Sequence, residues 1–224
     1  MSIEVFYHGS NRVRGERMIS NQQMEISRGE KHWLGDGTYF FEEILHTFKW
    51  IVDMFKDKYN HLLFNYDNLK QHYLIIEAKV IWDKSRVFDL TKVEHKLIYD
   101  RLREKLEEQK ILTDKYKDME FVEGVVINYM FNEFEEYPRD FDVIKAMFIR
   151  NTSNYRGLKS RLGYIPQIQI CVRNISIIKS ILEWEFFDQF NDLEQKLRSM
   201  ERKQETQQSV ENSVYSLKRR NRKY

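Results

Sequence analysis

Three short segments of this 224-residue chain hold residue types that could bind a polar ligand and act on it. Phe6–Ser10 is a strand-like stretch that ends in His-Gly-Ser, and Trp33–Glu42 is a Gly-Asp-Gly turn that runs into Thr-Tyr-Phe-Phe. Gln167–Asn174 alternates like a strand and carries two glutamines on one face. Each segment also has a plain structural interpretation, namely a turn, a hairpin that packs aromatic side chains, and the solvent face of an edge strand.

Metal sites and common nucleophile sites are not predicted. The six histidines lack the paired spacing of metal ligands, and no Gly-Lys-Ser/Thr follows the first glycine turn as in a P-loop. No Gly-x-Ser-x-Gly elbow is present. Cys171 is the only cysteine, which excludes an internal disulfide, and its apolar surroundings favour a small buried hydrophobic role.

Taken in order, the three segments resemble the ADP-ribosyltransferase superfamily, on the His-Tyr-Glu side that includes poly(ADP-ribose) polymerases and diphtheria toxin. His8-Gly9-Ser10 matches the early motif of that family, and Gly35 to Phe40 matches its Gly-x-Gly-x-Tyr-Phe motif. Gln169 occupies the position of the catalytic glutamate on the late strand. The resemblance covers residues 3–57 and 140–182, and it is closest to small uncharacterised bacterial members.

The resemblance implies a cleft that binds NAD, the donor of ADP-ribose, without a metal. It gives His8 a hydrogen bond to the adenine-side ribose, Gly9 main-chain bonds to the nicotinamide amide, and Tyr39 a stacking contact with the nicotinamide ring. The residues expected to bind NAD are His8, Gly9, Ser10, Gly37 and Tyr39, and those expected to be catalytic are Tyr39, Gln167 and Gln169.

The chain departs from the family where it has Gln169 in place of glutamate. An amide can bond a ribose hydroxyl but brings no negative charge to an oxocarbenium-like transition state. Losing such a charge costs about 3–4 kcal/mol of transition-state stabilisation. Glu42 and Glu43 are the nearest acids in sequence to the Tyr39 strand, and their alternative role is to favour a helix N-terminus.

The pattern around these segments predicts an α+β fold. Strands are expected at Ile3–His8, Thr38–Phe41, His72–Val80, Val87–Leu90, Gln167–Val172 and Ile175–Leu182. Helices are expected around Ile44–Phe55, at Thr91–Leu112 with Thr91 and Glu94 as a capping box, and at Asp118–Asn132. Asp142–Ile149 is ambiguous between helix and strand, and residues 151–163 suggest a loop. With the resemblance, we expect a split β-sheet core with a helical insertion at about 91–139 that shapes target access beside the cleft.

The C-terminal part continues with a helix and a polar tail. Phe186, Phe190, Leu193, Leu197 and Met200 form a heptad-like seam, which predicts either packing within the chain or a self-dimer. Residues 201–224 carry seven Lys or Arg against three Glu, so the tail could bind phosphates or serve only as a solvated end. We therefore expect one domain over residues 1–200 and a basic tail over 201–224.

The amino-acid composition limits the classes of protein to which this chain can belong. Hydrophobic residues make up 42% and charged residues 32%, which is typical of a globular chain, and the net charge of +2 gives no overall field for nucleic acid or membrane. No apolar run reaches the roughly 20 residues of a membrane span, and no signal peptide is evident. We expect a soluble, cytoplasmic protein with no membrane partner.

These observations lead to two hypotheses about function. The first is a mono-ADP-ribosyltransferase that modifies a protein or nucleic acid; the resemblance implies a toxin or phage-defence effector, with an antitoxin as a further partner. The second is a catalytically inactive module that binds NAD or ADP-ribose, which the Gln169 substitution favours. Titration with NAD while free nicotinamide is monitored distinguishes the two.

Overall fold

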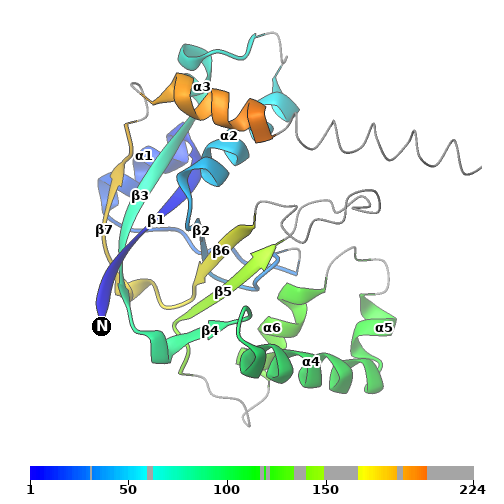
Figure 1. Cartoon of the computed structure of the whole chain (residues 1–224). Helices are drawn as coiled ribbons and strands as arrows, with labels where there is room; N and C mark the ends of the chain where they lie inside the picture. The colour runs from blue at the N-terminus through cyan, green and yellow to red at the C-terminus, as the bar shows by residue number, and fades with distance from the viewer. Residues whose placement is uncertain are drawn as a thin grey trace, which may run out of the picture. The chain divides into compact units, whose positions relative to one another are not determined.

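The strands of the described residues form one sheet in the order β4-β5-β6-β2-β1-β3-β7 (Figure 1). The computed structural model describes residues 1–30, 32–59, 63–116, 119, 122–133, 140–148, 166–185 and 189–200. The strands are β1 (Ser2–Asn11), β2 (Thr38–Phe41), β3 (Tyr73–Trp82), β4 (Val87–Asp89), β5 (Val143–Phe148), β6 (Gln167–Val172) and β7 (Ile178–Glu183). The α+β class predicted from the sequence is confirmed.

The two halves of the sheet meet at one residue pair. β1 pairs with β3 along its whole length, from Ser2 opposite Trp82 to Asn11 opposite Tyr73. β2 pairs with β6 over four positions, whereas β1 and β2 are in register only at Tyr7 and Phe41. The sheet is therefore continuous, but its β4-β5-β6-β2 half and its β1-β3-β7 half share a narrow junction.

Helices cover both faces of this sheet. They are α1 (Arg12–Asn21), α2 (Ile44–Lys58), α3 (Tyr66–His72), α4 (Val93–Glu108), α5 (Ile111–Lys115) and α6 (Glu123–Asn132), with short 3-10 turns at Lys84–Arg86 and Ile175–Ile177. Met18 of α1 packs in one apolar cluster with Phe6, Phe40 and Ile76, which defines the α1 face. The opposite side, against which α2 packs, is called the α2 face.

Most predicted strands are confirmed within one or two residues, and the stretch that was ambiguous between helix and strand contains strand β5. The 3-10 turn at Ile175–Ile177 occupies the start of the last predicted strand. Helix α1 was not predicted from the sequence, because Gly15 and polar side chains weaken its apolar pattern. The Asn11 side chain caps it by accepting a hydrogen bond from the Arg14 N–H at 2.9 Å.

Helix α2 lies close against β1 because Gly9 has no side chain. A β-carbon at Gly9 would come within 2.6 Å of the Trp50 ring and 2.8 Å of the Ile51 side chain. The predicted apolar face of α2 is confirmed, since Phe48, Ile51 and Phe55 are fully buried. The hydroxyl of Tyr73 on β3 also donates to the Met54 carbonyl at 3.2 Å.

The predicted capping box of the insertion is wrong. Helix α4 begins at Val93 after Lys92, which makes no side-chain cap, and Thr91 instead donates its N–H and hydroxyl to Asp89. The spacing of Val93, Leu97, Leu102 and Leu106 predicts one apolar face, of which Leu102 and Leu106 are buried but Val93 and Leu97 are exposed. The buried residues of α4 are Tyr99, Leu102 and Leu106.

Helix α6 of the insertion supports the glycine turn of the second sequence motif. The Asn128 amide accepts a hydrogen bond from the Asp36 N–H at 2.8 Å and donates to the Asp36 carboxylate at 3.1 Å. Gly35 takes a φ of +74°, and Gly124 lets α6 abut the His32 carbonyl. The insertion, which is expected to lie beside the cleft, therefore contacts the glycine turn that is expected to bind NAD.

Asp142 connects three segments where β5 begins. Its carboxylate accepts hydrogen bonds from Arg86 at 2.5 and 3.0 Å and from the Asn174 amide at 2.9 Å. Its main chain bonds Arg86 and Arg173. The Arg86 guanidinium holds the pKa of the Asp142 carboxyl below its usual range.

The chain divides into two compact units, 1–147 with 168–184 and 148–167 with 185–224. A helix covers residues 190–200 in the second unit, as predicted. Phe190, Leu193, Leu197 and Met200 are buried within the single chain, which favours the interpretation of the seam as internal packing. Phe186, the loop at 151–163 and the tail at 201–224 lie outside the described residues.

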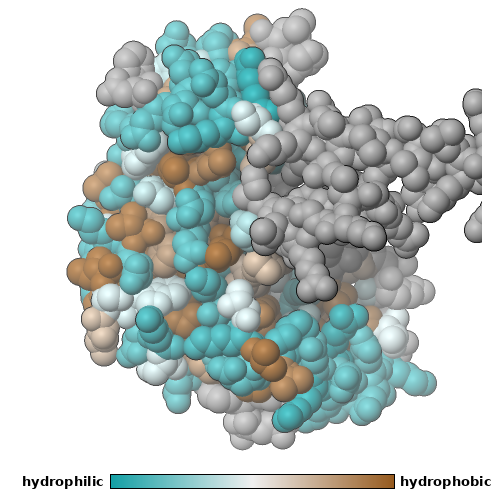
Figure 2. All heavy atoms as spheres, in the orientation of Figure 1, coloured by the Kyte–Doolittle hydropathy of each residue, from teal (hydrophilic) through white to brown (hydrophobic). Residues whose placement is uncertain are grey.

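The visible surface of the described residues is mixed. Large apolar side chains such as Ile3, Val5 and Leu182 are exposed. Figure 2 shows the apolar residues of this face as separate brown areas among hydrophilic ones. The apolar surface on this side is divided among small areas.

We predict that Asp142→Asn lowers the free energy of unfolding by about 2 kcal/mol, because it removes a charged acceptor from three hydrogen bonds. Asp100→Asn is the matched control, since Asp100 forms an exposed ion pair with Lys96 on α4. Its replacement should change the free energy of unfolding by less than about 0.5 kcal/mol. Urea unfolding monitored by circular dichroism measures both.

The same pair of proteins tests the lowered pKa of Asp142. The stabilisation is complete at neutral pH and is lost as pH falls below the ordinary carboxyl pKa of about 4 and through the lower native value. The difference between wild type and Asp142→Asn should therefore shrink in acid. A difference that is constant from pH 7 to pH 3 contradicts the assignment.

We also predict that Gly9→Ala lowers the free energy of unfolding by about 1–3 kcal/mol without any ligand, because the new methyl overlaps α2. The loss should be smaller in a Trp50→Leu background, where the overlap is partly relieved. Unchanged unfolding of Gly9→Ala would show that α2 moves away at no cost.

Candidate functional site

The three sequence motifs lie on three neighbouring strands. β6, β2 and β1 are adjacent in the sheet, and Gln169 on β6 lies opposite Phe41 on β2, which lies opposite Tyr7 on β1. Figure 1 shows these strands together at the centre of the fold. Segments more than 120 positions apart in the sequence are thus brought side by side.

Strand alternation divides the predicted site residues between the two faces of the sheet. Gly9, Tyr39 and Gln169 point to the α2 face, and Gln167, two positions before Gln169, follows the same alternation. His8 and Ser10 alternate to the α1 face, where Ser10 is buried. The structure brings part of the predicted set onto one face and leaves His8 and Ser10 on the other.

His8 links β1 to β2 through a hydrogen bond. Its ring lies edge-on to the Phe40 ring, with centroids 5.9 Å apart, and its Nδ1 donates to the Tyr39 carbonyl at 2.6 Å. Burial lowers the pKa of His8, and the bond to Tyr39 partly opposes that effect. The neutral His8 imidazole thus supplies a hydrogen bond to the β2 main chain at the point where main-chain pairing between β1 and β2 stops.

The Tyr39 hydroxyl forms two hydrogen bonds with the main chain of the glycine turn. It donates to the Gly35 carbonyl at 2.5 Å and accepts from the Leu34 N–H at 2.9 Å, while its ring lies 5.7 Å from the His32 ring. Burial raises the pKa of Tyr39, so the phenol stays protonated. The hydroxyl fixes the turn, and only the ring is left for a stacking contact.

The glycines expected to bind NAD are also required by packing. A β-carbon at Gly9 would overlap α2, as described above. One at Gly37 would lie 2.3 Å from the Cys171 sulfur. Cys171 is buried, as expected, and burial raises its pKa to about 12, so it is a thiol rather than a nucleophilic thiolate.

The two glutamines of β6 are buried polar groups without a hydrogen bond in the described part of the chain. Gln169 is 8% exposed and Gln167 is 6% exposed. Among the described residues, the fully buried side-chain polar atoms without a hydrogen bond are the Tyr99 hydroxyl and one Glu123 carboxylate oxygen. The amides of Gln167 and Gln169 make no hydrogen bond but keep contact with solvent, so they are open to a ligand or to water. Gln169 offers both a donor and an acceptor on the α2 face.

Arg173 was not singled out from the sequence. It follows Cys171 by two positions, so it also points to the α2 face, and its guanidinium lies 4.2 Å from the centre of the Phe131 ring and donates to the Asp36 carbonyl at 3.3 Å. Burial lowers its pKa. No carboxylate of the described residues lies within ion-pair distance of it, but the nearby Asp36 charge raises its pKa and partly opposes the effect of burial. The alternation of Gln169, Cys171 and Arg173 could have identified it.

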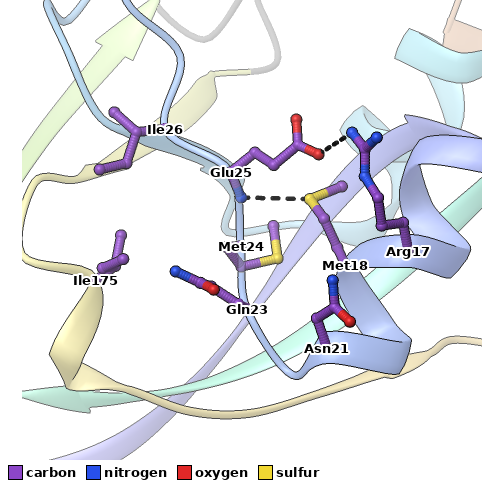
Figure 3. Close-up of a pocket in the computed structure, with 8 residues that line it drawn as sticks. All are labelled: Arg17, Met18, Asn21, Gln23, Met24, Glu25, Ile26 and Ile175. Atoms are coloured by element: carbon purple, nitrogen blue, oxygen red, sulfur yellow. Dashed lines mark hydrogen bonds and ion pairs between the residues drawn. The ribbon is translucent and has the colours of Figure 1, made fainter.

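A pocket of about 410 Å³ lies elsewhere, beside α1 (Figure 3). It is lined by Arg17, Met18, Asn21, Gln23, Met24, Glu25, Ile26 and Ile175. Glu25 already accepts from Arg14 at 2.5 Å and from Arg17. The charged groups of this pocket therefore satisfy one another, and none of the predicted site residues lines it.

The described residues contain no group of three or more His, Cys, Asp or Glu side chains arranged to hold a metal ion. Among their helices, none combines the length and apolar character needed to cross a membrane.

Comparison with known proteins shows a family. No family model and no solved structure matches the chain. Uncharacterized protein MJ0359 of Methanocaldococcus jannaschii is 40% identical over 191 residues, which cover 80% of this chain and 85% of that protein. Identity at this level over most of both chains establishes common ancestry, so the protein belongs to the same family as uncharacterized protein MJ0359.

Proposed function

We propose that the protein is an NAD-dependent mono-ADP-ribosyltransferase that transfers ADP-ribose to a macromolecular target. The observation that carries the proposal is the adjacency of the three motifs on β1, β2 and β6. The resemblance implies that these motifs lie side by side, and the order of β1, β2 and β6 in the sheet supports the proposal to that extent.

In this proposal NAD binds over the α2 face at β2 and β6. The Gln169 amide bonds a ribose hydroxyl, which supplies the partner that this buried group lacks. The Arg173 guanidinium pairs with the diphosphate, for which its planar donors are well suited. The Tyr39 ring contributes a stacking surface, while its hydroxyl keeps the turn in place.

His8 and Ser10 have a different part in this proposal from the one implied by the resemblance. The His8 ring packs by Phe40 on the α1 side, away from Gln169. Its contribution is to hold the Tyr39 main chain, and through it β2, at the junction. This departure weakens the match to the family and leaves Gln169 and Arg173 as the residues that decide the proposal.

The second candidate is a module that binds NAD or ADP-ribose without catalysis. The observation that favours it is the neutral side chain of Gln169 at the place where the related enzymes have a carboxylate. Both candidates predict NAD binding, and only the transferase predicts release of nicotinamide.

We predict that Gln169→Leu weakens NAD binding about tenfold or more while leaving the protein as stable as wild type, or more stable. The physical reason is that leucine removes the amide that bonds the ribose hydroxyl in this proposal, and that this amide makes no hydrogen bond that stabilises the free protein. Calorimetric titration with NAD and thermal unfolding measure the two effects. A large loss of stability with unchanged NAD affinity would make Gln169 purely structural.

We predict that Arg173→Gln raises the dissociation constant for NAD about tenfold or more and has a smaller effect on nicotinamide riboside, which lacks the diphosphate. Arg103→Gln is the control, since Arg103 pairs with Glu107 on the outside of α4. Release of free nicotinamide during the NAD titration then separates the transferase from the binding module. Wild-type protein that does not bind NAD rejects both.

A further inference from the structure

Glu42 and Glu43 form the bend between β2 and α2, and their neighbours differ. The register of Phe41 with Gln169 continues by one residue, because the Glu42 N–H donates to the Ile168 carbonyl at 3.4 Å. Glu43 is still extended, with φ −107° and ψ 130°. Lys145, which bonds the Glu42 carboxylate, is two positions from Val143 of the apolar cluster on the α1 face, whereas the Glu43 charge acts on Tyr7, which alternates with Gly9 to the α2 face.

The contacts of the two acids agree with this division. The Glu42 carboxylate accepts a hydrogen bond from the Lys145 ammonium at 2.9 Å, so its charge is already paired. Glu43 is exposed, and although it is the N-cap residue of α2, its side chain makes no capping bond. Its side chain is therefore not committed to the helix terminus.

Glu43 is near Tyr7, which belongs to a set of register partners, Tyr7, Phe41 and Gln169, on the neighbouring strands β1, β2 and β6. Burial raises the pKa of Tyr7, and the nearby charges of Glu77 and Glu43 raise it further. Tyr7 is the register partner of Phe41, which is the register partner of Gln169. Independently of the acids, Gln169 on this same face is more than nine-tenths buried and lacks a hydrogen bond among the described residues.

We propose that Glu43 supplies the carboxylate of the transfer reaction that the family carries at the position of Gln169. This inference rests on the proposed function. The bond between ribose C1′ and the nicotinamide nitrogen breaks, and its electron pair neutralises the pyridinium ring. The Glu43 carboxylate stabilises the positive ribose that remains. The acceptor oxygen or nitrogen then bonds to C1′, and its proton passes to Glu43 and on to solvent.

We predict that Glu43→Gln slows nicotinamide release about 10²- to 10³-fold, as expected for loss of one transition-state charge. Its dissociation constant for NAD should stay within threefold of wild type. Glu42→Gln is the matched control, because the Glu42 carboxylate is already paired with Lys145, and it should keep release within threefold. Placing a carboxylate on β6, as Gln169→Glu in the Glu43→Gln protein, should restore part of the lost rate.

The outcomes separate this inference from the function on which it rests. If wild type binds and cleaves NAD, and Glu43→Gln does so at the same rate, Glu43 has no such role and the transferase stands. An equal loss in Glu42→Gln also overturns the assignment. Wild type that binds NAD without releasing nicotinamide rejects the role of Glu43 and leaves the binding module. A failure to bind NAD rejects the proposed function, and this inference falls with it.

Discussion

The arrangement of the molecule depends on the narrow junction between β1 and β2. A ladder that ends after one residue pair leaves main-chain carbonyls that need donors. Two side chains provide them, since His8 Nδ1 donates to Tyr39 and the Thr47 hydroxyl on α2 donates to the Tyr7 carbonyl at 3.4 Å. The junction thus joins the two halves of the sheet, holds β2 and positions the start of α2.

The two faces of the sheet differ because of this arrangement. The α1 face is closed by a continuous apolar cluster that includes Phe6, Phe40 and Ile170. The α2 face keeps polar groups whose charges or amides are not matched within the described chain, notably Gln169 and Arg173. These groups give the α2 face donors and an acceptor for a polar ligand, which the apolar α1 face lacks.

The helical insertion is part of the site's support. Asn128 bonds both the N–H and the carboxylate of Asp36, and the absence of a side chain at Gly124 lets α6 reach the segment before the turn. Tyr39 holds the same turn from the β2 side. A change in α6 therefore reaches the turn directly, and removal of the insertion is expected to disturb the candidate NAD face together with target access.

The sequence by itself determined the local structure: alternating or apolar runs predicted most strands and α2, because those patterns depend on neighbouring residues alone. It missed α1, whose Gly15 is accommodated against Leu74, and it placed Thr91 as the cap of α4, whereas Thr91 donates to Asp89 and the helix begins after Lys92 without a side-chain cap. The motifs indicated which strands carry the candidate site, but the tertiary structure decided which face each residue occupies. His8 and Tyr39 have their side chains on opposite faces of the sheet, and Glu42 and Glu43 have different neighbours. The face on which a side chain lies depends on strand register and on pairing across the sheet, and no local sequence pattern contains that information.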